Sequence, residues 1–271
     1  MYELSRRVRI TLNPAQLGPG GPLAPEPADR ALDTIGVGAF YELEVSCRGE
    51  PAPRTGFVMN ISEIDAAVRG QAVTMIEEAM RRWMTGARRS AGAVLAEILG
   101  ALQPRLGHAV ASVRWWLSPY HWLLVETTNM DRVLISQQFE FAAAHRLHCP
   151  DLSDEENRSV FGPCNNPSGH GHNYKLEAVV SVPLTDDGGP LGFARIEQLV
   201  DEHVIRRFDH KHLNLDTQEF ARLIPSVEHI ARICHERLEG PVAEAGGRLE
   251  RVTVWETDKT ACTYPAGAST P

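Results

Sequence analysis

The chain has 271 residues, of which 43% are hydrophobic and 23% charged, with a formal net charge of −8 at pH 7. These proportions are those of an ordinary globular protein with one large domain or two smaller ones. The acidic balance argues against a nucleic-acid or anionic-membrane surface, and no apolar run approaches the length of a membrane span. The beginning, "MYELSRRVRITLNP", also lacks the apolar core of a signal peptide, so we expect a cytoplasmic protein without nucleic-acid or membrane partners.

The five cysteines are an odd number spread thinly along the chain, which predicts reduced thiols instead of a disulfide framework. Cys47 and Cys234 lie in apolar patterns and are predicted to be small core residues. Cys149, Cys164 and Cys262 have more polar neighbours, and their roles stay open.

Four segments of the first half have counterparts in the same order in the second half: two match in residues, one of them with a one-residue gap, the third matches in the spacing of small and apolar positions, and the fourth by its place. The pairs are "FYELEVSC" (40–47) with "NYKLEAVV" (173–180), "TGFVMNISEIDAAV" (55–68) with "LGFARIEQLVDEHV" (191–204), "RSAGAVLAEIL" (89–99) with "PSVEHIARICH" (225–235), and "VRWWLSP" (113–119) with "VTVWETD" (252–258). We therefore predict two tandem copies of one domain, residues 1–128 and 129–271.

Each copy has the same predicted elements. Period-2 alternation over 135–141 and 174–182 indicates strands, and "LTDDGGPLG" (184–192) indicates a turn. Apolar residues at helical spacing follow at 196–204 and 227–238, and residues 251–264 return to strand-like composition. The prediction is an α+β fold in which each copy is an antiparallel four-stranded sheet with two helices on one face. The Pro/Gly-rich segment 18–30 and the tail 265–271 are predicted to be mobile.

The histidines are not shared between the two copies. Of the 11 histidines, only His108 and His121 fall in the first copy. Where the second copy has "HGH" (170–172), the first has "VGA" (37–39), and where the second has Glu256, the first has Leu117. We expect Gly171 to be kept for backbone geometry and the two imidazoles to serve chemistry confined to the second copy.

Residues i and i+2 of a strand point to the same side, so His170 and His172 can direct two nitrogens at one point. Zinc accepts neutral histidine nitrogens, and a catalytic zinc site usually has three protein ligands and one open position. His145, which ends the first strand of the second copy, is the favoured third ligand, and His148 is the alternative. A structural zinc site on Cys149 and Cys164 fits less well, because the sequence has no C-x-x-C pair.

Four motifs in order then carry a resemblance: "FEFAAAHRL", "LSDEENRSVFGPCNNPSGHGHNYKLE", "FDHKHLNLD" and "VWETD". The second copy resembles the 6-pyruvoyl-tetrahydropterin synthase family of the tunnelling fold (T-fold), and the first copy resembles it only through the repeat. The resemblance implies two tandem T-fold domains: a degenerate copy at 1–128 that lacks metal ligands, and a catalytic copy at 129–271. It also implies roles for individual residues: a catalytic zinc (Zn2+) bound by His145, His170 and His172; Cys164 as general base; Asp209 and His210 as a proton relay; Glu256 as anchor of the pterin ring; and Ser226 and Glu228 as further pterin contacts.

The implied function is that of a zinc-dependent carbon–oxygen lyase, which converts 7,8-dihydroneopterin triphosphate to 6-pyruvoyl-tetrahydropterin with elimination of triphosphate. The spacing of six positions from Cys164 to His170 favours this chemistry over the related 6-carboxy-tetrahydropterin synthases of the deazapurine pathway. That activity and a non-catalytic pterin-binding protein are the alternatives. Arg146, Lys211 and Lys259 flank the motifs and are candidates to meet the triphosphate.

The resemblance further implies a homo-oligomer, because enzymes of this fold form rings of subunits closed by strand pairing. Three tandem chains would then make a pseudo-hexamer. The first copy would supply interface surface around the active second copy.

Overall fold

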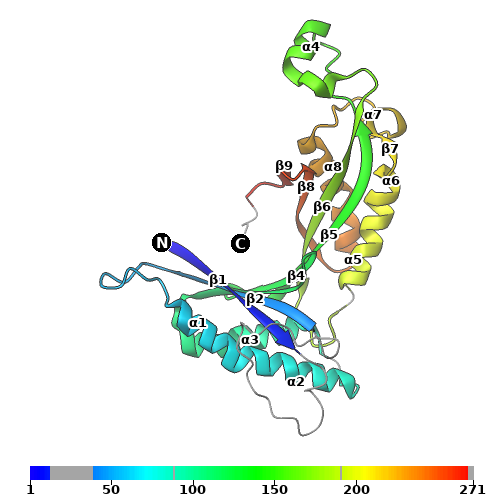
Figure 1. Ribbon diagram of the computed structural model, residues 1–271. Coiled ribbons are helices and arrows are strands. Elements are labelled where there is room, and N and C mark those ends of the chain that lie inside the picture. The colour runs from blue at the N-terminus through cyan, green and yellow to red at the C-terminus, as the bar shows by residue number, and fades with distance from the viewer. Residues whose placement is uncertain (13–38, 88, 190, 268–271) are drawn as a thin grey trace. The chain divides into compact units, whose positions relative to one another are not determined.

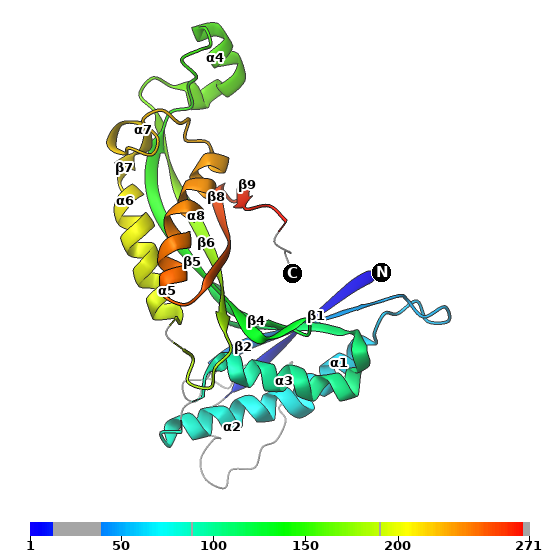
Figure 2. The same cartoon turned by 180° about the vertical axis from the view of Figure 1, so that it is seen from behind.

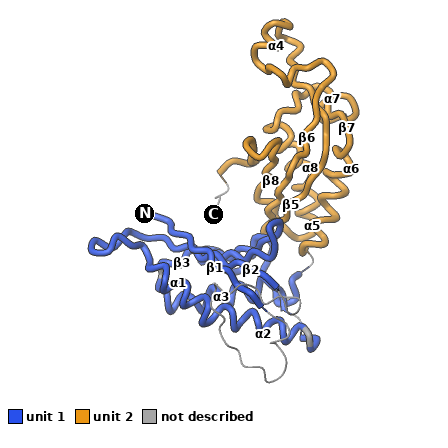
Figure 3. The backbone as a smooth tube through the Cα atoms, viewed as in Figure 1, with its two compact units in different colours: residues 1–135, 182–189 blue, residues 136–181, 190–271 orange. Residues whose placement is uncertain are grey.

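The computed structural model describes residues 1–12, 39–87, 89–189 and 191–267. The segment 18–30 and the last four residues of the tail, both predicted to be mobile, lie outside these ranges. The chain divides into two compact units, unit 1 with residues 1–135 and 182–189, and unit 2 with residues 136–181 and 190–271 (Figure 3). The expected boundary after residue 128 differs from this division, because strand β5 (Asn129–His145) begins in unit 1 and continues into unit 2 without a break.

Unit 1 is an antiparallel sheet with its helices on one face (Figures 1 and 2). The strand order is β1-β2-β3-β4. Its elements are β1 (Tyr2–Leu12), β2 (Ala39–Gly49), α1 (Ile61–Ala67), a π-helical turn (Val68–Ala72), α2 (Val73–Met84), α3 (Ala91–Leu106), a 3-10 turn (Gly107–Ala109), β3 (Val110–Ser118) and β4 (His121–Glu126). Alternate residues Leu43, Val45 and Cys47 of β2 are fully buried, and Ser90 caps α3 by accepting a hydrogen bond from the backbone N–H of Ala93.

Unit 2 repeats this plan with the strand order β5-β6-β8-β9, and the short β7 pairs with β5. Its elements after β5 are α4 (Asp154–Phe161), a 3-10 turn (Gly162–Asn165), β6 (His170–Pro183), α5 (Phe193–Val200), a π-helical turn (Asp201–Ile205), α6 (Arg206–Phe208), β7 (Lys211–His212), α7 (Leu213–Asp216), α8 (Val227–Glu244), β8 (Arg248–Thr257) and β9 (Thr260–Tyr264). Helix α4 belongs to an excursion between β5 and β6, beyond the ends of both strands (Figures 1 and 2).

The two units pair their strands in the register that the sequence repeat predicts. Aligning "FYEL" with "NYKL" makes Glu42 equivalent to Lys175, and aligning "VRWW" with "VTVW" makes Trp116 equivalent to Trp255. In the structure Glu42 lies opposite Trp116, and Lys175 lies opposite Trp255. The two sequence alignments are therefore consistent with each other, because residues that they make equivalent form the same cross-strand pair in both units.

Irregularities recur at equivalent places as well. The register shifts between Ser46 and Cys47 in unit 1 and between Val179 and Val180 in unit 2, positions that the repeat aligns with one another. The first helix of each unit also contains a π-helical turn, at 68–72 and at 201–205, although the repeat aligns residue 68 with residue 204. Such bulges are retained features of a fold rather than accidents of packing.

The expected α+β organisation with antiparallel sheets is confirmed, and so are buried positions for Cys47 and Cys234. Cys149, Cys164 and Cys262 are partly exposed. Among the helices of the described residues, none is long and apolar enough to cross a membrane.

Candidate metal centre

Three histidines meet where strands β5 and β6 adjoin α8. His145 is the last residue of β5, and His170 and His172 open β6. Because strand residues alternate, His170, His172 and Tyr174 share one side of β6. The candidate ligand atoms of the three histidines all lie within 4.8 Å of one another, so the structure brings together the three predicted ligands.

His145 is oriented by the segment that precedes α8. Its Nδ1 lies 2.7 Å from the carbonyl oxygen of Pro225, to which it donates, and this leaves Nε2 directed at the other imidazoles. The side chain is fully buried, and burial is the largest cause that lowers the pKa of His145, to about 4. The ring is therefore neutral at pH 7, which is the form that binds a metal ion.

The spacing of the nitrogens fits a metal ion such as zinc. The two Nε2 atoms of His145 and His170 are 3.1 Å apart. Zinc–nitrogen bonds in tetrahedral geometry set two ligand nitrogens about 3.3 Å apart. Nε2 of His172 is buried without a hydrogen-bond partner. A bound cation would give that nitrogen the partner that the protein does not supply.

His148, the alternative third ligand, is engaged elsewhere. Its Nδ1 accepts hydrogen bonds from the Arg146 guanidinium at 3.3 Å and from the Asn165 amide at 3.1 Å. The choice between the two candidates is a matter of reach, because His145 still lies on the strand whereas His148 has left it.

Glu256 and Cys164 lie beside the cluster. A carboxylate oxygen of Glu256 is 3.4 Å from Nε2 of His145 and 3.7 Å from Nε2 of His172. Partial burial and then the negative charge of Glu256 raise the pKa of the Cys164 thiol. The thiol and the carboxylate are thus electrostatic neighbours, and a cation bound between them would lower that pKa again.

Asp209 and His210 form a pair in a turn. The two side chains are hydrogen-bonded at 2.8 Å, and Asp209 also accepts from the backbone N–H of Ala142 at 2.8 Å. His210 has a left-handed φ of 56°, which turns its ring back toward Asp209. Among the contacts of the described residues, none joins Cys164 to Asp209 or to His210.

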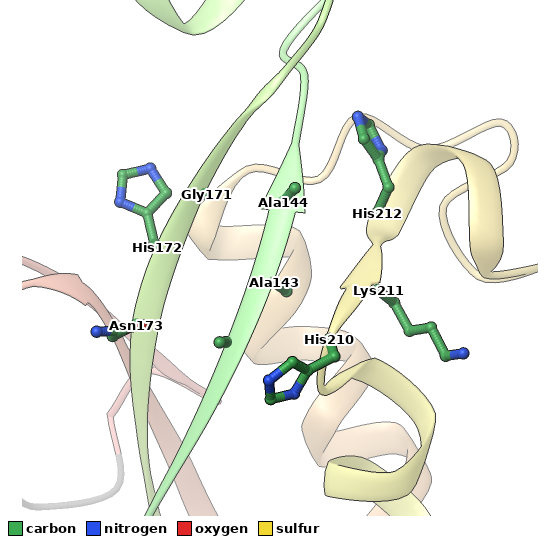
Figure 4. A pocket seen from close by; sticks show the side chains of 9 residues that line it. Ala143, Ala144, Gly171, His172, Asn173, His210, Lys211 and His212 are labelled. Atoms are coloured by element: carbon green, nitrogen blue, oxygen red, sulfur yellow. The ribbon is translucent and has the colours of Figure 1, made fainter.

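Strand β5 separates this pair from His172. Figure 4 shows His172 and Asn173 on β6, and His210 and Lys211 across β5 from them. The pocket drawn there has a volume of about 460 Å3 and is lined by Ala142–Ala144, Gly171–Asn173 and His210–His212. Of the three basic residues predicted to flank the site, Lys211 lines this pocket, whereas Arg146 is engaged by Asn165 and His148.

Ser226 and Glu228 begin helix α8, directly after Pro225. Ser226 is the N-cap and accepts from the backbone N–H of His229. Its hydroxyl also donates to Glu228, and that hydrogen bond is the largest cause that lowers the pKa of the Glu228 carboxyl. Glu228 is exposed and ionised, one turn of chain away from the residue that orients His145.

Tyr174, which the repeat aligns with Tyr41 of unit 1, contacts one of the three histidines. Its hydroxyl lies 3.3 Å from Nδ1 of His145, and the ring is fully buried. Burial, and then the charges of Glu256 and Cys164, raise the pKa of the phenol. Because Tyr41 occupies the equivalent place in unit 1, the sequence repeat did not indicate that the Tyr174 hydroxyl contacts His145.

The glycine that the site requires is Gly169, not Gly171. Gly169 has a φ of 71°, and a Cβ there would lie 2.6 Å from Nε2 of His212 and 2.9 Å from the carbonyl oxygen of His145. A Cβ on Gly171 would meet only the carbonyl oxygen of Ala143, at 3.6 Å, an ordinary contact. The expectation that Gly171 is needed for backbone geometry was therefore wrong, because that residue lies in regular strand.

The geometry defines an α+β unit with a site fit for a metal ion, and comparison with known proteins gives its family. Residues 134–266 match the family model described as 6-pyruvoyl tetrahydropterin synthase. Human 6-pyruvoyl tetrahydrobiopterin synthase is 36% identical over 131 residues, which cover 48% of this chain and 89% of the human protein. The chain belongs to the 6-pyruvoyl tetrahydropterin synthase family, as its motifs predicted.

Two further proteins are similar to part of this chain. A putative 6-carboxy-5,6,7,8-tetrahydropterin synthase of Archaeoglobus fulgidus is 33% identical over 89 residues, which cover 33% of this chain and 69% of that protein. The solved structure of Caenorhabditis elegans 6-pyruvoyl tetrahydropterin synthase is 33% identical, with a TM-score of 0.45, and covers 49% of this chain and 94% of that one. All the candidate site residues lie within the region matched by the family model, whereas residues 1–133 lie outside it.

Proposed function

We propose that the chain is a zinc-dependent 6-pyruvoyl-tetrahydropterin synthase, a carbon–oxygen lyase. It would convert 7,8-dihydroneopterin triphosphate to 6-pyruvoyl-tetrahydropterin and triphosphate. The observation that carries the proposal is the three-histidine cluster with Glu256 and Cys164 beside it, within the region that matches the family model. The pteridine ring is reduced in this reaction while its side chain is oxidised, so no external reductant is required.

The three histidines would hold zinc, which would supply a Lewis acid for the side-chain oxygens of the substrate and a positive charge that favours the Cys164 thiolate. Supporting features are the neutral state of His145, the 3.1 Å separation of two Nε2 atoms and the unpartnered Nε2 of His172. Pro225 fixes the ring of His145 through its Nδ1, the usual arrangement around a metal-bound imidazole.

Cys164 is proposed as the base that removes a proton from a carbon of the substrate side chain. In the metal-free protein the pKa of its thiol is raised, so the thiol is protonated at pH 7 and is a poor base. Its activity should therefore depend on the metal. We expect the Cys164 thiolate to form only when the metal is bound.

The two glutamates are proposed to hold different ends of the substrate. The N–H edge of a pterin ring and the carbon that bears the side chain lie at opposite ends of the bicycle. Glu256 is next to the metal ligands, which suits the side chain, whereas the exposed Glu228 with Ser226 stands at the start of α8. Glu228 is then the better candidate for the paired N–H donors of the ring, and Glu256 for the side-chain hydroxyls.

Asp209 and His210 are proposed to act in an oligomer. The His210 side chain is 84% exposed, and β5 lies between it and His172, so the pair is not arranged to serve Cys164 of its own unit. A ring of chains would bring the pair to the site of a neighbouring copy. This reading keeps the predicted relay but assigns it to a second molecule.

Unit 1 is proposed to be a degenerate T-fold copy with a scaffold role. The shared strand register, shared bulges and shared π-helical turns support a common origin of the two units. Three tandem chains could then form a pseudo-hexameric ring. A solution mass incompatible with a multiple of three chains would exclude that assembly.

The test of the proposed function is incubation of the zinc-loaded chain with 7,8-dihydroneopterin triphosphate, with products identified by mass. We expect 6-pyruvoyl-tetrahydropterin and triphosphate, about one zinc per chain, and full zinc retention without turnover in Cys164→Ala. A 6-carboxy product would establish the related deazapurine-pathway activity instead. Binding of the pterin without any product would indicate the non-catalytic alternative.

A further inference from the structure

The segment that follows His145 leaves the sheet, so its backbone polar groups need partners other than a neighbouring strand. Asn214 of α7 supplies two of them. Its Oδ1 accepts from the backbone N–H of Arg146 at 2.8 Å, and its Nδ2 donates to the carbonyl of Arg146 at 3.0 Å. One side-chain amide therefore takes the place of a partner strand at the residue directly after a metal ligand.

The same segment is joined to the turn that carries Cys164. The backbone N–H of Leu147 donates to the carbonyl of Cys164 at 2.9 Å. The Arg146 guanidinium likewise donates to the carbonyl of Asn165 at 3.3 Å, and in the opposite direction the Asn165 amide donates to the carbonyl of Leu147 at 2.7 Å. Residues 146–147 are thus held between Asn214 on one side and residues 164–165 on the other.

Asn214 is itself held in place. Strand β7 pairs with β5, with His212 opposite Ala144, and Leu213 is fully buried. The single turn of α7 is closed by two hydrogen bonds, from the backbone N–H of His212 to Asp216 at 2.7 Å and from the Thr217 hydroxyl to the carbonyl of Leu213 at 2.6 Å. The position of Asn214 is therefore set by the sheet and not by a free loop.

We propose that Asn214 and Asn165 are positioning residues that fix the Cys164 thiol relative to the metal ligand His145. The proposal rests on the proposed function in one respect, that Cys164 is the base. A base must approach the proton that it removes within hydrogen-bond distance, and a misplacement of about 1 Å can lower the rate about 100-fold. The two amides hold the backbone of residues 146–147 in one position, and with it the distance between the Cys164 thiol and His145.

The two hydrogen bonds to the backbone of Arg146 explain why residue 214 is asparagine. Pairing with both backbone groups of Arg146 needs one acceptor and one donor on a short, planar side chain. Aspartate has the same shape but only acceptors, so Asn214→Asp would set a carboxylate oxygen against the carbonyl of Arg146. This substitution breaks one of the two hydrogen bonds to Arg146 while the volume of the side chain stays nearly the same.

The experiment compares Asn214→Asp, Asn214→Ala and Asn165→Ala with the wild type, each as the full zinc-loaded chain. We expect the zinc content to stay at about one per chain and kcat for dihydroneopterin triphosphate to fall about 10- to 100-fold, with a much smaller change in KM. The rate of Cys164 alkylation by iodoacetamide, read at the peptide level by mass spectrometry, should change by at least about threefold, while that of Cys149 should not.

Asn157→Ala is the matched control. Asn157 is a fully buried asparagine of the same excursion, but its side-chain amide bonds, among the described residues, to Cys149, Leu152 and Ser153 alone. We expect it to lower the stability of the α4 region while leaving Cys164 alkylation unchanged. Equal effects of Asn157→Ala and Asn214→Asp on alkylation would mean general loosening and would overturn the proposal.

The proposal is also overturned if Asn214→Asp retains kcat and the alkylation rate of Cys164 within about twofold of wild type. If the wild type itself does not turn over the substrate, the proposed function fails, but the alkylation comparison still decides whether Asn214 positions the thiol. Asn214→Asp keeps the test informative if Asn214→Ala does not fold.

Discussion

Units 1 and 2 share a strand register but differ at the end of the sheet where β2 and β6 begin. Unit 1 has Leu12 opposite Ala39 there, with Leu117 further along β3. Its aligned tyrosine, Tyr41, packs edge-on against Trp115 with ring centroids 5.3 Å apart. Unit 2 has His172 in place of Ala39 and Glu256 in place of Leu117. The same backbone pairing therefore tolerates either an apolar end or a polar, titratable one.

The difference separates what the fold needs from what the chemistry needs. Buried polar atoms without partners, such as Nδ1 of His170 and Nε2 of His172, each cost about 1–3 kcal/mol. Unit 1 avoids that cost with aliphatic side chains. The histidines of unit 2 are therefore not explained by stability, and a bound cation would offset their cost through its binding free energy.

The largest effect, on zinc affinity, is expected when a proposed zinc ligand of unit 2 is replaced by its counterpart in unit 1. His172→Ala introduces the residue that unit 1 carries as Ala39. Zinc affinity should fall at least about 100-fold, since changes to outer-shell partners alone cost about 10- to 100-fold, and turnover should be lost. Zinc content and competition with a chelator measure this.

His121→Ala in unit 1 is the control for this substitution, and it should retain zinc. The free energy of unfolding of metal-free His172→Ala should stay within about 1 kcal/mol of wild type, because an unpartnered nitrogen is removed. Full zinc retention in His172→Ala would contradict this prediction, because a unit with alanine at this position, as in unit 1, would then bind zinc as well.

The next largest effect concerns the backbone before His170. Gly169→Ala forces a residue with a Cβ into a left-handed conformation, at about 1–2 kcal/mol, and pushes that Cβ against His212 and the carbonyl of His145. We expect a total loss of about 2–4 kcal/mol in urea unfolding, together with weaker zinc binding. Gly171→Ala, two residues away on an exposed stretch of β6, should cost less than about 1 kcal/mol. The reverse order would mean that the wrong glycine has been identified.

Much of the fold could be predicted from this sequence because the chain contains its own comparison. The repeat aligned "FYEL" with "NYKL" and "VRWW" with "VTVW", and both alignments fall in one cross-strand register. Period-2 and helical patterns then gave the order of elements. The exact division of the units was not predictable, because β5 is continuous and no composition change marks residue 135.

The site was predictable in its residue types but not in its supports. Spacing and motifs gave the three histidines and Cys164. The requirement for Gly169 depends on φ and on the distance to His212, neither of which the sequence reveals. The separation of His210 from His172 is likewise a property of the sheet, because β5 lies between them (Figure 4).

The acid stability of the metal-free protein gives a third test of the comparison. The folded-state pKa of His145 is about 4, below the value of about 6.5 expected when the chain is unfolded. The unfolded state therefore binds the proton more readily, and the contribution to stability that is present above pH 6.5 is lost as the pH falls toward 4. The loss from this group is at most about 3 kcal/mol.

His145→Leu, which replaces the imidazole with a buried aliphatic side chain that cannot titrate, isolates that contribution. Urea unfolding of the metal-free proteins between neutral and acid pH should show a shallower pH dependence in the variant than in the wild type. Parallel pH profiles would mean that His145 titrates normally and is not the neutral, buried ligand described above.

The smallest expected effect tests a tyrosine that the repeat aligns between the two units. Tyr174→Phe removes a buried hydroxyl 3.3 Å from Nδ1 of His145, whereas Tyr41→Phe removes one from a half-buried ring packed on Trp115. We expect Tyr174→Phe to cost about 1 kcal/mol and to weaken zinc binding by up to about tenfold, because it removes an outer-shell contact of a ligand. Tyr41→Phe should change zinc affinity by less than about twofold. If chelator titration gives Tyr174→Phe the zinc affinity of wild type, Tyr174 only packs, as its identity with Tyr41 first suggested, and the difference between the units begins at the histidines.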